Sequence, residues 1–134
     1  MKRTLTLLLT VVVLAGCATS NNMAARKQER AASYAALKPE IRALVDQGQI
    51  RRGMSQDAVY IAWGKPSQVL QQEDQHGVIV TWLYHGNYLE ETRYWPYRAR
   101  TPNYDYDIRS YISAEVVFQN GEVTNWRTLP KPPE

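Results

Sequence analysis

The sequence predicts an α+β domain in which short helices are followed by an antiparallel sheet. Between residues 39 and 64 the apolar side chains recur at helical spacing, whereas beyond Pro66 they alternate at every second position, as in a half-buried strand. The dipeptide Asn120-Gly121 is typical of a two-residue hairpin turn. Helices grouped before strands favour an α+β fold over an alternating α/β fold.

The first predicted helix begins at Pro39, because the fixed φ of proline suits a first helical turn. Ile41, Leu44 and Val45 then share one helical face. Gly48 can end this helix.

The second predicted helix lies between two capping signals. Ser55 is a good N-cap, and Asp57 favours the positive end of the helix dipole. Gly64 closes the helix and Pro66 prevents its continuation. A helix of about two turns must be held by packing, for which the candidates are Met54, Val59 and Trp63.

Four strands are predicted after the helices, at residues 67–72, 78–84, 104–119 and 122–127. In the third strand the even positions are mostly apolar and the odd positions mostly polar, which predicts one buried and one solvated face.

The predicted hairpin turn fixes a register for the last two strands. It places Phe118 opposite Val123, and Trp126 opposite Glu115 beside Val117. The second face of the sheet is therefore expected to carry Trp126 and not to be wholly polar.

The N-terminus has the pattern of a cleavable export signal. Lys2 and Arg3 precede an apolar run of about ten residues, which is well short of the roughly 20 that span a membrane. The segment Leu14-Ala15-Gly16-Cys17 resembles the bacterial lipobox, in which lipid is attached to the cysteine. Cys17 is therefore the expected lipid-attachment site, and the alternative is a soluble protein in which this cysteine is buried.

These signals divide the chain into four parts. Residues 1–16 are expected to be a lipoprotein signal peptide, residues 17–37 a lipid-anchored tether that is partly helical, residues 38–129 one folded domain, and residues 130–134 a proline-rich tail. In the tether, residues 23–37 favour a helix but have a thin apolar face, which predicts a marginal element. Its basic residues Arg26, Lys27 and Arg30 could contact anionic lipid or remain solvated.

Charge and composition argue against nucleic-acid binding. Removal of the signal takes away Lys2 and Arg3, which reduces the 16 basic residues to 14, against 13 acidic ones. A nearly neutral chain without a dense basic run is not typical of a nucleic-acid-binding protein.

Several short motifs follow Cys17 in order along the chain: Gly53-Met54-Ser55, Trp63-Gly64-Lys65-Pro66, Thr81-Trp82-Leu83-Tyr84 and Asn120-Gly121. With these motifs the chain resembles the SmpA/OmlA (BamE-like) family of outer-membrane lipoproteins over most of the domain. The resemblance implies two short helices packed on a three- to four-stranded antiparallel sheet. It also implies a non-enzymatic, periplasm-facing binding or scaffold subunit that contacts other envelope or outer-membrane assembly proteins and anionic phospholipid.

Two departures from the family pattern leave the partner open. The chain lacks, between Cys17 and Gly53, the Arg-Pro-Asp-Ile-rich stretch associated with BamE itself, and it carries an insertion at residues 85–103. A divergent relative with another partner is therefore one reading. Because secreted inhibitors of envelope hydrolases share the fold, a lipoprotein inhibitor or regulator of such an enzyme is the alternative.

The insertion supplies most of the candidate partner-binding residues. A structureless loop of this length is uncommon in a compact domain and is often functional. Its aromatic and arginine side chains are types enriched at binding hot spots, although they could instead pack back on the sheet as a flap. Together with one residue of the last strand, the candidates are Arg93, Tyr94, Trp95, Tyr97, Arg98, Arg100 and Trp126.

Catalysis, metal binding and cofactor binding are not expected. The chain has two histidines and one cysteine, and the cysteine is assigned to lipid, so no zinc set is apparent. Paired carboxylates for hydrolysis could come from Asp105 with Asp107 or from Glu90 with Glu91, but solvated surface acids explain them better.

Overall fold

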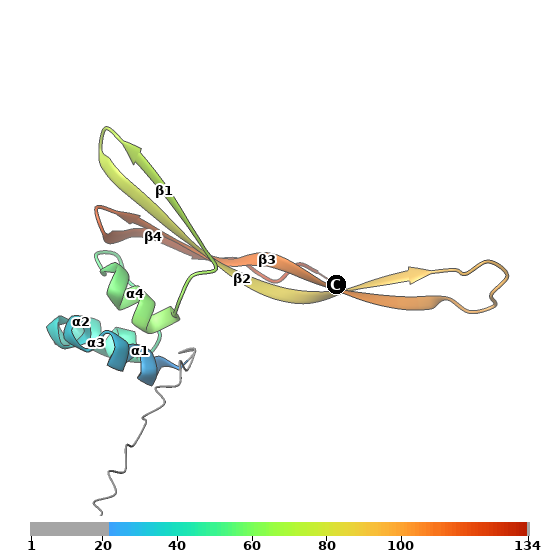
Figure 1. Ribbon diagram of the computed structural model, residues 1–134, viewed down its shortest axis with the longest axis horizontal. Helices are drawn as coiled ribbons and strands as arrows, with labels where there is room; N and C mark the ends of the chain where they lie inside the picture. The colour runs from blue at the N-terminus through green and yellow to red at the C-terminus, as the bar shows by residue number, and fades with distance from the viewer. Residues whose placement is uncertain (1–21, 134) are drawn as a thin grey trace, which may run out of the picture.

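The computed structural model describes residues 22–133 and places a layer of helices against one end of a long, open sheet (Figure 1). The helices are α1 (Met23–Glu29), α2 (Ala31–Ala36), α3 (Pro39–Asp46) and α4 (Gln56–Trp63), and the strands are β1 (Gln68–Asp74), β2 (Gly77–Tyr94), β3 (Asn103–Gln119) and β4 (Glu122–Thr128). The strands form one antiparallel sheet in the order β1-β2-β3-β4. The predicted α+β class is confirmed. Cys17 and the predicted signal lie outside the described residues.

Helices α3 and α4 form where their capping signals predict. Pro39 is the first residue of α3, and Ser55 is the N-cap of α4, where its hydroxyl accepts a hydrogen bond from the Ala58 amide at 3.2 Å. Helix α4 ends at Gly64, whose amide donates to the Tyr60 carbonyl at 2.7 Å. Helices α1, α2 and α3 all pack on α4, so this short helix is the centre of the helix layer.

The expectation of a marginal tether helix is wrong for the part of residues 17–37 that the structure describes. Arg26 of α1 is only 6% exposed, and Met23 packs against the hydrophobic core. Lys27 is not a free lipid contact, because its ammonium group lies 2.7 Å from the Asp46 carboxylate. Tertiary packing compensates for the thin apolar face, so α1 and α2 belong to the folded domain.

The core lies between α4 and one face of the sheet. Phe118 and Val116 of β3 are fully buried, and Trp82 of β2 packs on Phe118 with ring centroids 4.8 Å apart. The segment before α4 is tied to β4 by two backbone hydrogen bonds, from Gly53 to Val123 at 2.8 Å and from Val123 to Met54 at 2.9 Å. These contacts hold the helix layer at the end of the sheet where β1 and β4 pair with β2 and β3.

The final hairpin has the predicted two-residue turn, because Gln119 pairs with Glu122 and both Asn120 and Gly121 have positive φ. The pairing of Phe118 with Val123 is also confirmed.

The register beyond that pair differs from the prediction. A register shift between Val117 and Phe118 pairs Trp126 with Val116 and Arg127 with Glu115. A shift of one residue moves a side chain to the other face of the sheet. Trp126 therefore packs against the core and not on the open face beside Val117.

Gly64 gives the fold its most sensitive backbone position. Its φ of 90° and ψ of −168° lie in a region that is essentially restricted to glycine. We expect Gly64→Val to lower the free energy of unfolding by about 1 to 3 kcal/mol, measured as a lower urea midpoint. Gly64→Ala should show a large part of the same loss, because it has the same backbone conformation without the branched side chain. An unchanged midpoint for both variants would contradict this assignment.

Candidate functional site

Beyond the helix layer, β2 and β3 continue as a two-stranded ribbon that projects away from the rest of the molecule (Figure 1). Strand β1 pairs with β2 only from Gly77 to Leu83, and β4 pairs with β3 only from Ala114 to Gln119. Residues 85–94 and 103–112 therefore have only each other as strand neighbours. We call residues 85–112 the β-ribbon and its turn, residues 95–102, the tip.

The predicted loop at residues 85–103 is thus mostly strand, and only the tip lacks strand structure. The sequence did not indicate this because both faces of the outer part of the ribbon are exposed. Without burial on one face, a strand has no strict alternation of apolar and polar residues. The interpretation of this segment as a flap that packs back on the sheet is also wrong, because the ribbon projects away from the four-stranded part of the sheet.

A second register shift changes which residues of β2 and β3 share a face in the ribbon. Tyr84 pairs with Ala114, but the next residue, His85, pairs with Ile112, so Ser113 is an extra residue in β3. The even positions of β3 that face the core from Ala114 onward therefore change face in the ribbon. There the even β3 residues share a face with odd β2 residues, as in the pair Leu89 and Ile108.

The β-ribbon carries most of the exposed large hydrophobic side chains of the described residues. Ile108, for example, is 74% exposed. A concentration of apolar groups on one projecting element is typical of an interaction surface. The members are Leu89, Tyr94, Trp95, Tyr97, Tyr104, Tyr106, Ile108 and Ile112.

The tip presents aromatic and guanidinium groups directly to solvent. Trp95 is 64% and Tyr97 89% exposed, and the Arg98 guanidinium lies 5.2 Å from the centroid of the Tyr97 ring. A backbone hydrogen bond from Ala99 to the Pro96 carbonyl, 3.0 Å long, closes the turn. Arg98 has a φ of 65°, which is uncommon for a residue other than glycine.

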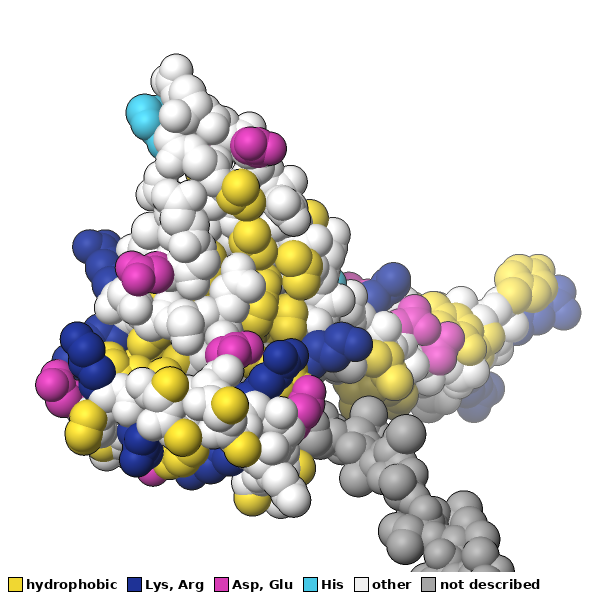
Figure 2. All heavy atoms as spheres, turned by 60° about the vertical axis from the view of Figure 1, so that its left-hand side comes forward, with side chains coloured by type: hydrophobic (Ala, Val, Ile, Leu, Met, Phe, Trp, Pro, Cys, Tyr) yellow, Lys and Arg dark blue, Asp and Glu magenta, His cyan; other side chains and the backbone are white. Residues whose placement is uncertain are grey.

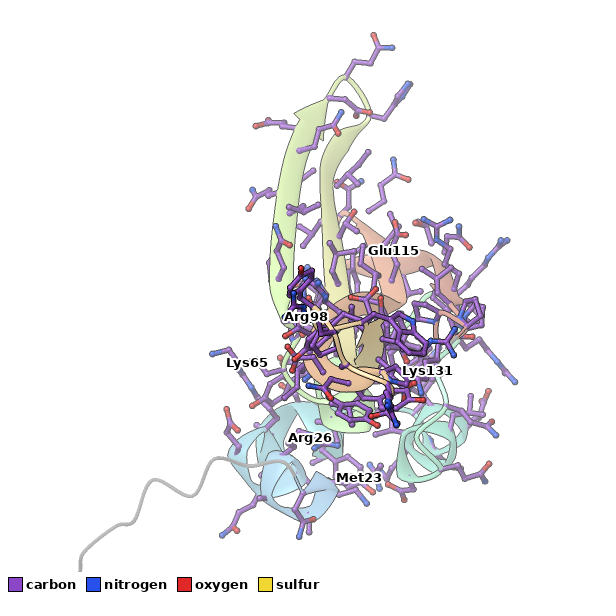
Figure 3. All side chains as sticks on the ribbon, turned by 90° about the vertical axis from the view of Figure 1, so that its right-hand side faces the viewer. Met23, Arg26, Lys65, Arg98, Glu115 and Lys131 are labelled. Atoms are coloured by element: carbon purple, nitrogen blue, oxygen red, sulfur yellow. The ribbon has the colours of Figure 1, made fainter. Side chains whose placement is uncertain are left out.

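The structure brings together six of the seven sequence-predicted binding residues. Arg93 and Tyr94 end β2, and Trp95, Tyr97, Arg98 and Arg100 follow in the tip. Figure 3 looks along the β-ribbon from the tip, with Arg98 in front and the helix layer with Arg26 behind it. Trp126 is in β4, pairs with Val116 and packs against the core, so it does not belong to this surface.

An ion-pair cluster and an edge-to-face contact between the Tyr88 and Tyr111 rings brace the middle of the β-ribbon. Arg109 donates to the Glu90 carboxylate at 2.7 Å and lies 3.5 Å from the Asp107 carboxylate. The hydrogen bond to Glu90 is the largest cause of the raised pKa of Arg109. Closer to the domain, the Tyr111 ring lies over Gly86, where an added Cβ would come within 2.7 Å of the ring. Only glycine leaves room for this contact.

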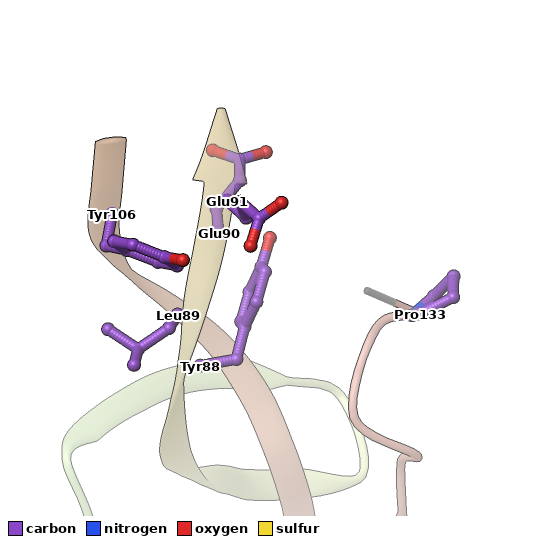
Figure 4. Close-up of a pocket in the computed structure, with 6 residues that line it drawn as sticks. All are labelled: Tyr88, Leu89, Glu90, Glu91, Tyr106 and Pro133. Carbon is purple, nitrogen blue, oxygen red and sulfur yellow. The ribbon is translucent and has the colours of Figure 1, made fainter. Parts of the chain in front are cut away.

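A shallow groove of about 660 Å³ runs beside the β-ribbon, on the β2 side (Figure 4). Its lining comes from the ribbon and from the C-terminal tail: Tyr88, Leu89, Glu90, Glu91, Tyr106 and Pro133. A hydrogen bond with Glu91 raises the pKa of the Tyr106 hydroxyl. The groove is therefore acidic and aromatic, and the proline-rich tail borders it.

The helix layer contains a buried arginine whose role the sequence did not indicate. Arg26 donates from Nε to the Ile61 carbonyl at 2.9 Å and from Nη2 to the Ala62 carbonyl at 3.3 Å, at the C-terminal end of α4. A cation is favourable there because the last carbonyls of a helix lack backbone partners. Next to it, burial raises the pKa of the Tyr84 hydroxyl, an effect that Arg26 opposes. This cluster stabilises the fold at the C-terminal end of α4.

Replacement of this arginine should destabilise the domain. We expect Arg26→Met to lower the free energy of unfolding by about 1.5 to 3 kcal/mol, since hydrogen bonds to a charged group contribute about that much. Lys27→Met is the matched control on the same helix, because its exposed ion pair with Asp46 contributes at most about 1 kcal/mol. Equal urea midpoints for the two variants would contradict the capping role of Arg26.

Elsewhere the charged groups balance one another. Figure 2 shows acidic and basic side chains interspersed over the helix layer. Within residues 22–133 there is no cluster of three or more His, Cys, Asp or Glu side chains that could hold a metal ion, and no helix is long and apolar enough to span a membrane. Glu90 and Asp107, considered above as acids for hydrolysis, both pair with Arg109.

No protein-family model, curated protein or solved structure matches this chain.

Proposed function

We propose that this chain is a lipid-anchored, periplasm-facing lipoprotein of the outer membrane that acts as a non-enzymatic binding or scaffold subunit, similar to the BamE component of β-barrel assembly. The anchor rests on the lipobox at Cys17, and the family on the motifs described above. The observation that carries the binding role is the projecting β-ribbon, whose tip exposes Trp95 and Tyr97 beside arginines.

The geometry separates the proposed anchor from the proposed contact. The described chain enters the fold at α1, in the helix layer, while the tip lies at the opposite end of the molecule (Figure 1). Ten residues of strand extend about 34 Å. A protein held at its N-terminus can therefore reach a partner that lies well beyond its own helix layer.

The chemistry of the tip favours a protein partner. Trp95 and Tyr97 offer large rigid surfaces that lose little conformational freedom on binding. Arg98 and Arg100 offer planar guanidinium groups that pair with carboxylates or backbone carbonyls. Anionic phospholipid is a weaker candidate for this surface, because acidic Glu90 and Glu91 lie in β2 shortly before the tip.

The test is a comparative pull-down from mild-detergent extracts of the envelope, with mass spectrometry. Partners of the unaltered protein that disappear with Trp95→Ala, and persist with the β1 control Leu70→Ala, would be bound through the tip. Both substituted side chains are exposed and hydrophobic. A difference in partner recovery between the two variants therefore reflects where the side chain lies on the fold. Identical recovery with both variants would contradict the proposed role of the tip.

A narrow projecting turn also suits insertion into the concave active site of an enzyme, which favours inhibition or regulation of an envelope hydrolase as the second candidate function. The same pull-down separates the two. Barrel-assembly components in the tip-dependent fraction support the scaffold role, whereas a single soluble hydrolase supports inhibition.

A further inference from the structure

The outer edge of β2 in the β-ribbon is a free strand edge. Proteins usually blunt such edges with lysine, proline or very short strands, because unpaired backbone groups can recruit another strand. Residues 85–94 contain neither lysine nor proline and form a continuous strand of ten residues. The His85 amide donates to the Ser67 hydroxyl at 3.0 Å, and beyond this residue the edge is open to pairing.

The groove described above runs along this edge. Tyr88 and Glu90 lie on one face of the ribbon and Leu89 and Glu91 on the other, yet all four residues line the groove. The hollow therefore reaches the backbone edge of β2 that lies between the two faces.

The chain's own tail borders this space but cannot complete the sheet. Three of its residues, Pro130, Pro132 and Pro133, lack the backbone N–H that a strand must donate. The described tail therefore does not supply an additional strand.

Charge complementarity points to a second copy of this chain as the source of the added strand. Glu91 and Arg93 lie on the same face of β2, one on each side of Thr92. If two copies of β2 pair antiparallel about Thr92, each Glu91 lies directly opposite Arg93 of the other copy. Cross-strand pairs of opposite charge stabilise a sheet. We propose that the protein self-associates through this edge, so that two β-ribbons form one four-stranded sheet.

The corresponding edge of β3 is less suited to self-association. Antiparallel pairing about Ile108 would oppose Asp107 and Arg109 of the two copies, but Arg109 already bonds both Glu90 and Asp107 within its own chain. Among the described residues no ion pair engages Arg93. Its guanidinium group is therefore available to a second copy.

Disulfide trapping of the full-length chain in membranes tests the proposed register. At the centre of the proposed pairing, two Thr92 Cα atoms would lie about 4.5 to 5.5 Å apart, within the range that a disulfide bridges. We expect Thr92→Cys to give a covalent dimer under mild oxidation. Asp105→Cys is the matched control, because Asp105 pairs with Thr92 on the same face but lies in the other strand, and it should remain monomeric, as should the unaltered chain.

Charge reversal provides a second test of the proposed pairing. Arg93→Glu in the Thr92→Cys chain opposes like charges and should abolish the covalent dimer, and adding Glu91→Arg should restore it. A monomeric Thr92→Cys chain, equal trapping of Asp105→Cys, or no rescue by the double reversal would overturn the proposal. Because the readout is the dimer and not the capture of a partner, this proposal and the proposed function can fail separately.

Discussion

Cys17→Ser is expected to block lipidation and to leave the protein as the uncleaved precursor. Lipid attachment requires the thiol, which the serine hydroxyl does not replace. Each buried lipid methylene contributes about 0.8 kcal/mol, so two or more chains give an effectively permanent anchor that the variant would lack. Carbonate extraction and detergent phase partitioning, with gel mobility to report cleavage, measure both effects.

The control for this prediction is Ala18→Ser, which changes the next residue and keeps the thiol. This variant should remain in the detergent phase at the mature size. If Cys17→Ser also stays in the membrane at the mature size, the lipoprotein assignment is wrong.

The second large effect is expected at the tip. Trp95→Ala, or the paired change Arg98→Ala with Arg100→Ala, should weaken partner binding by about 2 kcal/mol or more, roughly thirtyfold in Kd. The reason is that exposed aromatic and guanidinium groups on a projecting turn contribute to a partner contact and little to the fold. Titration of the isolated partner against each variant measures this loss.

Thermal unfolding of the same variants controls for a structural role. Trp95 is 64% exposed, so its truncation should leave the melting temperature nearly unchanged. If Trp95→Ala lowers the melting temperature markedly while the affinity for the partner is retained, the tip is a structural element and the proposed binding role is wrong.

Local signals predicted α3, α4 and the final hairpin well. Pro39, Ser55 and Gly64 mark helix ends through backbone requirements that do not depend on distant contacts. Asn120-Gly121 likewise specifies its own turn, and the nearest cross-strand pair, Phe118 with Val123, follows from it. Such features depend on the residues next to them, which the sequence shows directly.

The register shifts were not predictable in the same way. Each inserts one unpaired residue into a strand whose pattern remains regular, and each changes the face of every residue beyond it. The shift between Val117 and Phe118 moved Trp126 to the core, and the shift after Tyr84 moved the even-numbered β3 residues of the β-ribbon to the other face. Burial of Arg26 could not be predicted from the sequence either, because its acceptors on α4 are backbone carbonyls 35 and 36 residues away along the chain.

The central claim, that the tip contacts a protein partner, is tested most directly by photo-crosslinking within the intact envelope. A photoreactive phenylalanine derivative would replace Tyr97 at the tip or Gln72, an exposed residue of β1, in the membrane-bound chain. The predicted result is a discrete adduct with another protein from position 97 and none from position 72. An adduct from position 72 with none from position 97 would contradict it.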